Sequence, residues 1–233
     1  MTFKELTLKL KSLEKKGFIP SIRRGPTAIG HLLESQLGIR ETNLAIPDIG
    51  GRVEIKGTRR NANALITLFT FNRGVWRIKQ KEVISKFGYI DNSERKSLYS
   101  TVSSGSSNSQ GFKIEIDADR NLIILKNDFE KETIAEWSTY VIAGKFMTKL
   151  DRLLLIYADS KIEYETELFW FNEAYLLEQP TPENFLESFR RNEIFLDIRM
   201  HLKQSGGVRN HGTGFRIAEK NLINLYKRKK RII

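Results

Sequence analysis

Two carboxylates and a lysine gather around a short strand-like segment near residue 50. Glu54 and Lys56 are separated by one residue, so their side chains share a face of an extended strand, while the apolar residues beside Glu54 face the other way. Asp48 precedes the strand, and the pair Gly50-Gly51 allows the chain to turn between them. We therefore expect Asp48, Glu54 and Lys56 to converge.

Such a set suits the hydrolysis of phosphodiester bonds. Mg²⁺ takes oxygen ligands, typically one or two carboxylates together with phosphate and water. Held by Asp48 and Glu54, it would polarise the phosphate and lower the pKa of a bound water. Lys56 would orient or help deprotonate that water and offset the charge that builds on the phosphate. The pattern predicts a magnesium-dependent nuclease centre.

The motif has a plainer interpretation, because Glu-x-Lys alone is not specific. The same spacing recurs at Glu14 and at Glu94, and the copy at Glu54 could be a surface ion pair on an exposed strand edge. Glu34, on the predicted helix before the strand, could face the metal directly or through water. Equally, Glu34 could be a solvent-facing residue that supports its helix.

A second constellation, in the C-terminal part of the chain, suits the reading of bases. Arginine donates a fork of hydrogen bonds to guanine O6 and N7, and aspartate accepts from cytosine N4. Asp197 and Arg199 alternate along a predicted strand and so share a face, and Arg216 follows on a later strand. The pair suits a C·G-rich target, but on the residues alone an intramolecular Asp–Arg ion pair is the preferred interpretation.

Other basic residues are typical of phosphate contacts, which position a duplex without reading it. These are Arg23, Arg24, Arg59, Arg60, Lys203 and Arg209. Arg59 and Arg60 directly follow the predicted active-site strand. The basic run at 227–231 is interpreted as a solvated tail that adds nonspecific affinity.

The composition favours a nucleic-acid partner. Thirty-nine Lys+Arg against 28 Asp+Glu give a net charge of +11. So many like charges repel one another unless the protein binds a polyanion, of which nucleic acid is the commonest and an anionic membrane surface the second. The absence of cysteine excludes disulfides and thiol chemistry and fits the cytoplasm. The N-terminal segment predicts a short amphipathic helix, not a signal peptide, and no segment is long enough to span a membrane.

Hydrophobic periodicity indicates the elements that must position these residues. We expect helices at about 2–16, 27–37, 76–87, 138–149, 181–191 and 218–227, and strands at 51–56, 64–71, 97–103, 111–117, 121–126, 152–158, 166–172, 194–202 and 214–217. The strand at 152–158 is apolar throughout and therefore predicted to be central in a sheet. A Gly-rich basic loop is expected at 203–214. The order is mixed α/β without a clean βαβ repeat.

Several segments together resemble the MvaI/BcnI family of type II restriction endonucleases. They are AIGHLLESQLG, PDIGGRVEIKG, LITLFT, RIKQKEVISKFGYI, KLDRLLLIYADSK, FLDIRM and HGTGFRI, in this order along nearly the whole chain. That family is related in fold to the mismatch-repair nicking enzyme MutH and belongs to the PD-(D/E)xK nucleases. The resemblance implies a mixed central sheet flanked by helices, with catalytic and recognition lobes that form a DNA cleft.

The resemblance also implies domains and residue roles. The chain would be one endonuclease unit, 1–233, with a catalytic lobe mainly in 1–160 and a recognition lobe mainly in 165–217. Asp48 and Glu54 would hold the metal, Lys56 would serve the water, and Glu34 would support this centre. Asp197, Arg199 and Arg216 would read bases, and His211 would lie near the central base pair or the scissile region. Five residues separate Asp48 from Glu54, where about four are expected.

The implied activity is Mg²⁺-dependent cleavage of duplex DNA at a short pseudopalindrome with outer C·G pairs. The enzyme would act as a monomer that nicks the strands in turn, in the cytoplasm, together with a cognate DNA methyltransferase. Two alternatives remain: a MutH-like nicking endonuclease of DNA repair, and a DNA-binding relative that has lost catalysis.

Overall fold

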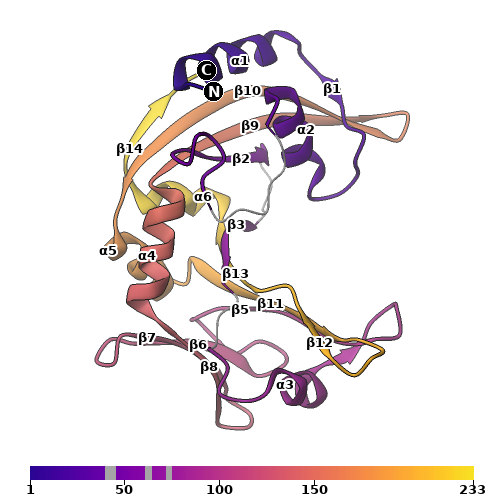
Figure 1. The fold of residues 1–233 in the computed structure, drawn as a ribbon, viewed down its shortest axis with the longest axis vertical. Helices are drawn as coiled ribbons and strands as arrows, with labels where there is room; N and C mark the ends of the chain where they lie inside the picture. Colours follow the sequence, from indigo (N-terminus) through magenta and orange to yellow (C-terminus); the bar gives the residue numbers. More distant parts are fainter. Residues whose placement is uncertain (40–45, 61–64, 72–74) are drawn as a thin grey trace. The chain divides into compact units, whose positions relative to one another are not determined.

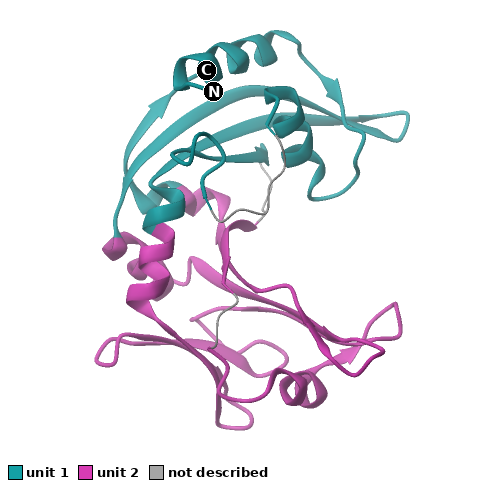
Figure 2. Ribbon diagram, in the orientation of Figure 1, with its two compact units in different colours: residues 1–64, 147–181, 223–233 teal, residues 65–146, 182–222 magenta. Residues whose placement is uncertain are grey.

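The computed structural model describes residues 1–39, 46–60, 65–71 and 75–233, and it divides the chain into two compact units (Figures 1 and 2). Each unit is assembled from segments that are far apart in the sequence. Unit 1 contains Met1–Ala64, Met147–Thr181 and Ile223–Ile233, and unit 2 contains Leu65–Phe146 and Pro182–Leu222.

Unit 1 is built on a five-stranded sheet in the order β1-β10-β9-β2, with β14 also paired to β10 (Figure 1). The strand β2 runs parallel to β9, and the other pairs are antiparallel, so the sheet is mixed, as expected. The elements of this unit are α1 (Phe3–Lys15), β1 (Ile19–Pro20), α2 (Ala28–Leu37), β2 (Glu54–Arg59), the end of α4 (Thr139–Leu150), β9 (Arg152–Glu163), β10 (Thr166–Pro180), the 3-10 helix η1 (Ile223–Leu225) and β14 (Tyr226–Arg231).

The strand β9 explains why the sheet forms where it does. Its residues 153–156 are all buried, so both of its faces are covered, and it lies between β10 and β2. The prediction of a central strand at 152–158 is confirmed. Both β9 and β10 continue several residues beyond the predicted ends, because they form one long antiparallel hairpin.

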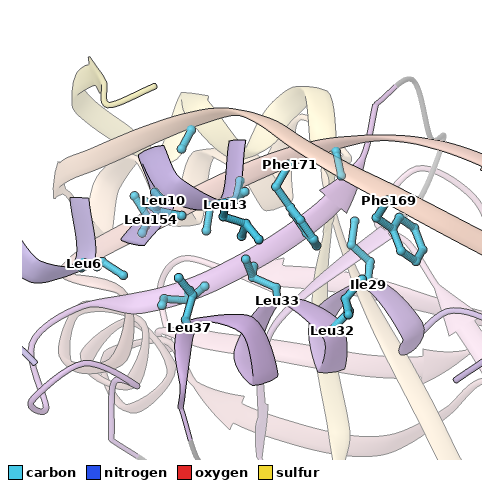
Figure 3. Close-up of a cluster of buried hydrophobic side chains, with 14 of the residues drawn as sticks. Leu6, Leu10, Leu13, Ile29, Leu32, Leu33, Leu37, Leu154, Phe169 and Phe171 are labelled. Carbon is cyan, nitrogen blue, oxygen red and sulfur yellow. The ribbon is translucent and has the colours of Figure 1, made fainter. Parts of the chain in front are cut away.

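The helices α1 and α2 supply leucines to the core of unit 1 (Figure 3). A capping box between Thr2 and Glu5 starts α1, and Gly38, at a left-handed φ of 71°, ends α2, close to the predicted ends. The buried cluster combines both helices with the sheet. Its members include Leu6, Leu10, Leu13, Ile29, Leu32, Leu33, Leu37, Ile55, Leu154, Phe169 and Phe171.

Unit 2 contains a six-stranded antiparallel sheet in the order β3-β13-β11-β5-β4, with β12 on β11, and a separate three-stranded sheet β6-β7-β8. Stacked and edge-on rings, among them Phe69, Phe185 and Phe215, fill its core. Its elements are β3 (Leu65–Phe71), α3 (Gln80–Phe87), β4 (Tyr89–Ile90), β5 (Lys96–Val102), β6 (Phe112–Asp117), β7 (Leu122–Asn127), β8 (Glu132–Ser138), most of α4, α5 (Pro182–Arg190), β11 (Ile194–Leu202), β12 (Val208–Asn210), β13 (Thr213–Ala218) and α6 (Glu219–Leu222).

The C-terminal end differs from its prediction. The helix expected at 218–227 is wrong over most of its length, because helical structure ends at Leu225 and the chain enters β14. The run at 227–231 is therefore not a loose tail. Its backbone pairs with β10, as in Leu176↔Lys230, while its side chains stay exposed. Ladder hydrogen bonds need only the backbone, so a row of charges does not prevent an edge strand.

Several other elements also differ from their predicted bounds. The strand β8 was not predicted, β12 lies within the expected loop at 203–214, and the helix expected from 76 begins at Gln80. Residue 64, the first of a predicted strand, lies outside the described residues. The predicted lobes, 1–160 and 165–217, cut the chain differently from the two units, because the strands β3 and β5 pair with β13 and β11 and so belong to unit 2.

The search for a membrane-spanning helix covered the described residues. None of the helices found there is long and apolar enough to cross a bilayer.

Candidate active site

Glu54 and Lys56 lie on one face of β2, as the strand alternation predicted. Lys56 Nζ donates a hydrogen bond of 2.8 Å to Glu54 Oε1. On the other face, Ile55 belongs to the core cluster of unit 1. The exposure of the pair is unequal: the side chain of Glu54 is 2% exposed and that of Lys56 is 27% exposed. The pair is thus not an ion pair on an open surface, because its carboxylate is buried and its ammonium reaches solvent.

A tight turn brings Asp48 back to the start of β2. Gly50 and Gly51 have φ values of 56° and 69°, in the region that favours glycine, and Ile49 and Val53 bridge across the turn. Because the turn takes up residues up to 53, the strand begins later than the predicted residue 51. Asp48 Oδ2 then accepts a hydrogen bond of 2.9 Å from the backbone N–H of Ile55. The carboxylate of Asp48 is therefore anchored at the residue that follows Glu54.

Lys149, which the sequence did not suggest, also reaches this centre. Its Nζ lies 3.4 Å from Glu54 Oε2, and its side chain is 18% exposed. Lys149 stands in the last turn of α4, and the strand that follows pairs in parallel with β2, as in Glu54↔Leu153. That pairing brings the end of α4 to the start of β2. A predicted helix directly before a central strand was the one available signal, and it does not reveal which strand is the neighbour.

A pocket of about 280 Å³ lies beside the strand and is lined by α2, β2 and the segment before α2. Glu34 and Lys56 both line it, together with Arg23 and His31. Glu34 therefore faces the same pocket as the candidate catalytic lysine. The alternative of a purely solvent-facing glutamate does not fit this placement.

The chemistry of the carboxylates fits a hard divalent cation. Within the described residues, no group of three or more His, Cys, Asp or Glu side chains is arranged to hold a metal ion, and the sequence predicted two carboxylate ligands, Asp48 and Glu54. Glu54 Oε2 is buried and has no hydrogen-bond partner, although Lys149 offsets its charge from 3.4 Å. A buried anionic oxygen without a hydrogen bond is a suitable ligand for Mg²⁺, which needs one or two protein carboxylates.

The three residues expected to read bases form one cluster in unit 2. Asp197 and Arg199 lie on β11 and Arg216 on β13. Arg216 Nη1 donates to Asp197 Oδ2 at 3.1 Å, Arg199 Nε lies 3.4 Å from the same oxygen, and Thr101 donates to Asp197 Oδ1 at 3.3 Å. The ion-pair alternative is thus present in the structure. Both arginine Nε atoms are buried without a hydrogen-bond partner, so neither guanidinium is fully used by this cluster.

His211 lies beside the same strand. Its backbone N–H donates to Arg199 O at 3.0 Å, and its ring centroid is 5.6 Å from that of His201. Burial lowers the pKa of His211, and the nearby charge of Arg209 lowers it further. Burial, followed by the charge of Arg95, also lowers the pKa of His201. Both imidazoles are therefore held toward the neutral form.

The residues predicted to contact phosphate differ in their surroundings. Lys203 and Arg209 are exposed, Arg24 makes an exposed 3.5 Å ion pair with Glu165, and Arg23 lines the pocket. In contrast, Arg59 donates to both oxygens of Glu167 at 2.7 Å.

Arg60 is engaged in the same way. It donates to Asp159 Oδ1 at 2.8 Å and is paired with Glu173. The pKa of Arg60 is raised by its hydrogen bond to Glu173. A phosphate would have to compete with these carboxylates for Arg60, and with Glu167 for Arg59.

Known proteins resemble this chain over nearly its whole length. A sequence model of the MvaI/BcnI restriction endonuclease family matches residues 7–226. The structure of restriction endonuclease MvaI in complex with its cognate DNA substrate is 27% identical, has a TM-score of 0.82 and covers 100% of both chains. MvaI in the absence of DNA is also 27% identical, with a TM-score of 0.58, and covers 100% of this chain and 99% of that one. A search of curated protein sequences found no match. The chain belongs to the MvaI/BcnI restriction endonuclease family and is a site-specific deoxyribonuclease.

Proposed function

We propose that this restriction endonuclease cleaves duplex DNA with Mg²⁺ at a centre made of Asp48, Glu54 and Lys56. The observation that carries the proposal is the convergence of two carboxylates and an ammonium at the start of β2: Asp48 is bonded to the N–H of Ile55, and Lys56 is bonded to Glu54. The relative MvaI forms a complex with its cognate DNA substrate, which supports DNA as the substrate of this chain. The net charge of +11 suits the same polyanion.

Each side chain of the centre has a distinct task. Asp48 and Glu54 would hold Mg²⁺, which when bound polarises the scissile phosphate and acidifies its water. The turn before β2 fixes Asp48, and the burial of Glu54 keeps bulk water away from its carboxylate. Lys56 lines the pocket, where its ammonium can orient the attacking water and stabilise the charge that develops on phosphate. Glu34, which lines the same pocket, would support this centre.

In this proposal, residues of unit 2 read the base sequence of the DNA recognition site. Arg199 and Arg216 would donate to guanines of a short pseudopalindrome with outer C·G pairs. Asp197 binds both arginines, so it either accepts from a cytosine or holds the two guanidiniums in position. His211, held toward the neutral form, would lie near the central base pair.

Backbone contacts complete the proposed interface. Lys203, Arg209 and Arg24 are candidates for phosphate contacts because their side chains are exposed, and Arg23 is a candidate because it lines the pocket that also contains Lys56. Arg59 and Arg60 could contact phosphate only if they gave up their ion pairs with carboxylates. They remain predicted phosphate contacts.

We further propose that the enzyme works as a monomer. Asp48, Glu54 and Lys56 all come from unit 1 of a single chain. This supports the proposal, because no second copy of the chain is needed to complete the catalytic centre. One centre cuts one strand at a time, which would make nicked DNA an intermediate. A site-specific nuclease in the cytoplasm would also attack the DNA of its own cell, so a cognate DNA methyltransferase is the expected partner.

Plasmid cleavage tests the proposal. Asp48→Ala and Lys56→Ala should each slow cleavage by at least about 10²-fold, since each removes a group that acts on the reacting phosphate or water. The control is Lys16→Ala, which removes the same charge from the Glu-x-Lys copy that begins at Glu14, on an exposed helix end. Chelation should stop the reaction and Mg²⁺ should restore it. Full activity of either site variant, or cleavage in excess chelator, would overturn the proposal.

The order in which the cleavage products appear tests the proposal that the enzyme works as a monomer. Nicked circles should appear before linear DNA, and the rate should rise in proportion to enzyme concentration. Direct double-strand breaks with a steeper concentration dependence would contradict a single centre acting twice. Nicked circles that never become linear would instead favour the MutH-like alternative.

A further inference from the structure

The carboxylate of Glu54 has an ammonium group on each of its two oxygens. Lys56 donates to Oε1 at 2.8 Å from the same strand, and Lys149 lies 3.4 Å from Oε2 at the end of α4. Glu54 is almost fully buried, and Lys149 is mostly covered as well. Nothing in the strand pattern requires this second lysine.

A purely structural role does not fully explain Lys149. A lysine in the last turn of a helix interacts favourably with the helix dipole, but it can do so while its long stem carries the ammonium into solvent. Lys149 instead directs its charge at the one oxygen of Glu54 that lacks a hydrogen bond. That is the oxygen which a metal ion would use.

We propose that Lys149 is a positioning residue that occupies the metal side of Glu54 and competes with the divalent cation for Oε2. This inference rests on the proposed metal site. With Lys149 in place, two ammonium groups balance the two carboxylates of Asp48 and Glu54, and Glu34 lines the pocket beside Lys56. The free enzyme therefore attracts a dication weakly, and the negative charge of a DNA phosphate restores the attraction.

The competition can be measured without catalysis. Titration calorimetry of the full chain with Mn²⁺, in the absence of DNA, should give about tenfold tighter binding for Lys149→Met than for the wild type, because a like charge beside the cation has been removed. Lys149→Arg, which keeps the charge, should bind as the wild type does. Lys145→Met, one turn earlier on α4, is the matched control and should change nothing.

Two further arms keep the test decisive. If Lys149→Met does not fold, as judged by its circular dichroism spectrum, Lys149→Gln replaces it, because the amide keeps a polar group beside Glu54. In a double-mutant cycle, Glu54→Gln should abolish the effect of the Lys149 substitution on Mn²⁺ binding. Unchanged or weaker Mn²⁺ binding by both Lys149 variants would overturn the inference.

Failure of the proposed function is recognised separately. Wild-type enzyme that binds no Mn²⁺, or whose binding is insensitive to Asp48→Ala, would remove the metal site itself. Wild-type binding that depends on Asp48, combined with no effect at Lys149, would remove only the role given to Lys149.

Discussion

The packing of α2 against β2 depends on the missing side chain of Gly57. A Cβ at this position would lie 3.0 Å from Leu33 Cδ2 and 3.6 Å from Ile29 Cγ1. Both neighbours are buried in the core of unit 1, so neither can swing into solvent. Overpacking a filled core costs about 1–3 kcal/mol, and alanine regains about 0.5–1 kcal/mol over glycine in a strand. Gly57→Ala should therefore lower the free energy of unfolding by about 1 kcal/mol.

The matched control is Gly144→Ala in α4. A Cβ there meets no atom within 4 Å, so the substitution should stabilise the protein by about 0.5–1 kcal/mol through helix propensity alone. Urea unfolding of both variants measures the change in the free energy of unfolding, which should be negative for Gly57→Ala and positive for Gly144→Ala. Gly57→Ala should also slow DNA cleavage, because Gly57 and Glu34 line the same pocket and α2 must move. A Gly57→Ala protein as stable as Gly144→Ala would refute the packing argument.

Three further predictions concern other parts of the chain. The hydroxyl of Tyr226 donates to Leu150 O at 3.0 Å, and burial raises the pKa of Tyr226 well above its usual value of 10.0. The folded state therefore keeps a proton that the unfolded state releases, and stability should fall as the pH rises above about 10. Tyr226→Phe should cost about 1–3 kcal/mol at neutral pH but flatten this alkaline loss, measured by urea unfolding from pH 7 to 11. Asp197→Asn should free Arg216 and reduce the preference for cognate over unrelated DNA by about 1–3 kcal/mol, measured by competition binding at fixed salt. Changing two lysines of 227–231 to glutamine should weaken binding to all sequences equally and lower the salt slope by about 0.9 per lost phosphate contact; an unchanged slope would exclude β14 from the interface.

The centre around Glu54 was predictable because its geometry is local. Strand alternation put Glu54 and Lys56 on one face, and the two glycines allowed the turn that returns Asp48. Lys149 was missed for the opposite reason. It reaches Glu54 only through the parallel pairing of β9 with β2, and a single sequence does not say which strands pair.

The two units combine distant segments of the chain for the same physical reason. The family resemblance implied a catalytic lobe mainly in 1–160 and a recognition lobe mainly in 165–217, whereas antiparallel partners such as β3 and β13 lie far apart in the sequence. The strand β14 shows a further limit. Its charge run is typical of a solvated segment, yet backbone pairing to β10 makes it an ordered edge.

Charge in the sequence also says little about which cations are available to DNA. Arg59 and Arg60 directly follow the candidate active-site strand and looked like phosphate contacts, but carboxylates hold both guanidiniums. In β14, by contrast, the side chains at 227–231 are exposed on a fixed edge. The cations that can release counterions from a duplex are those whose charge the protein has not already neutralised. Salt-dependent affinity should therefore respond more to the loss of an exposed β14 lysine than to the loss of Arg60, whose removal should chiefly destabilise the β9–β10 hairpin. A larger change of salt slope in Arg60→Gln than in Lys230→Gln would contradict this reasoning.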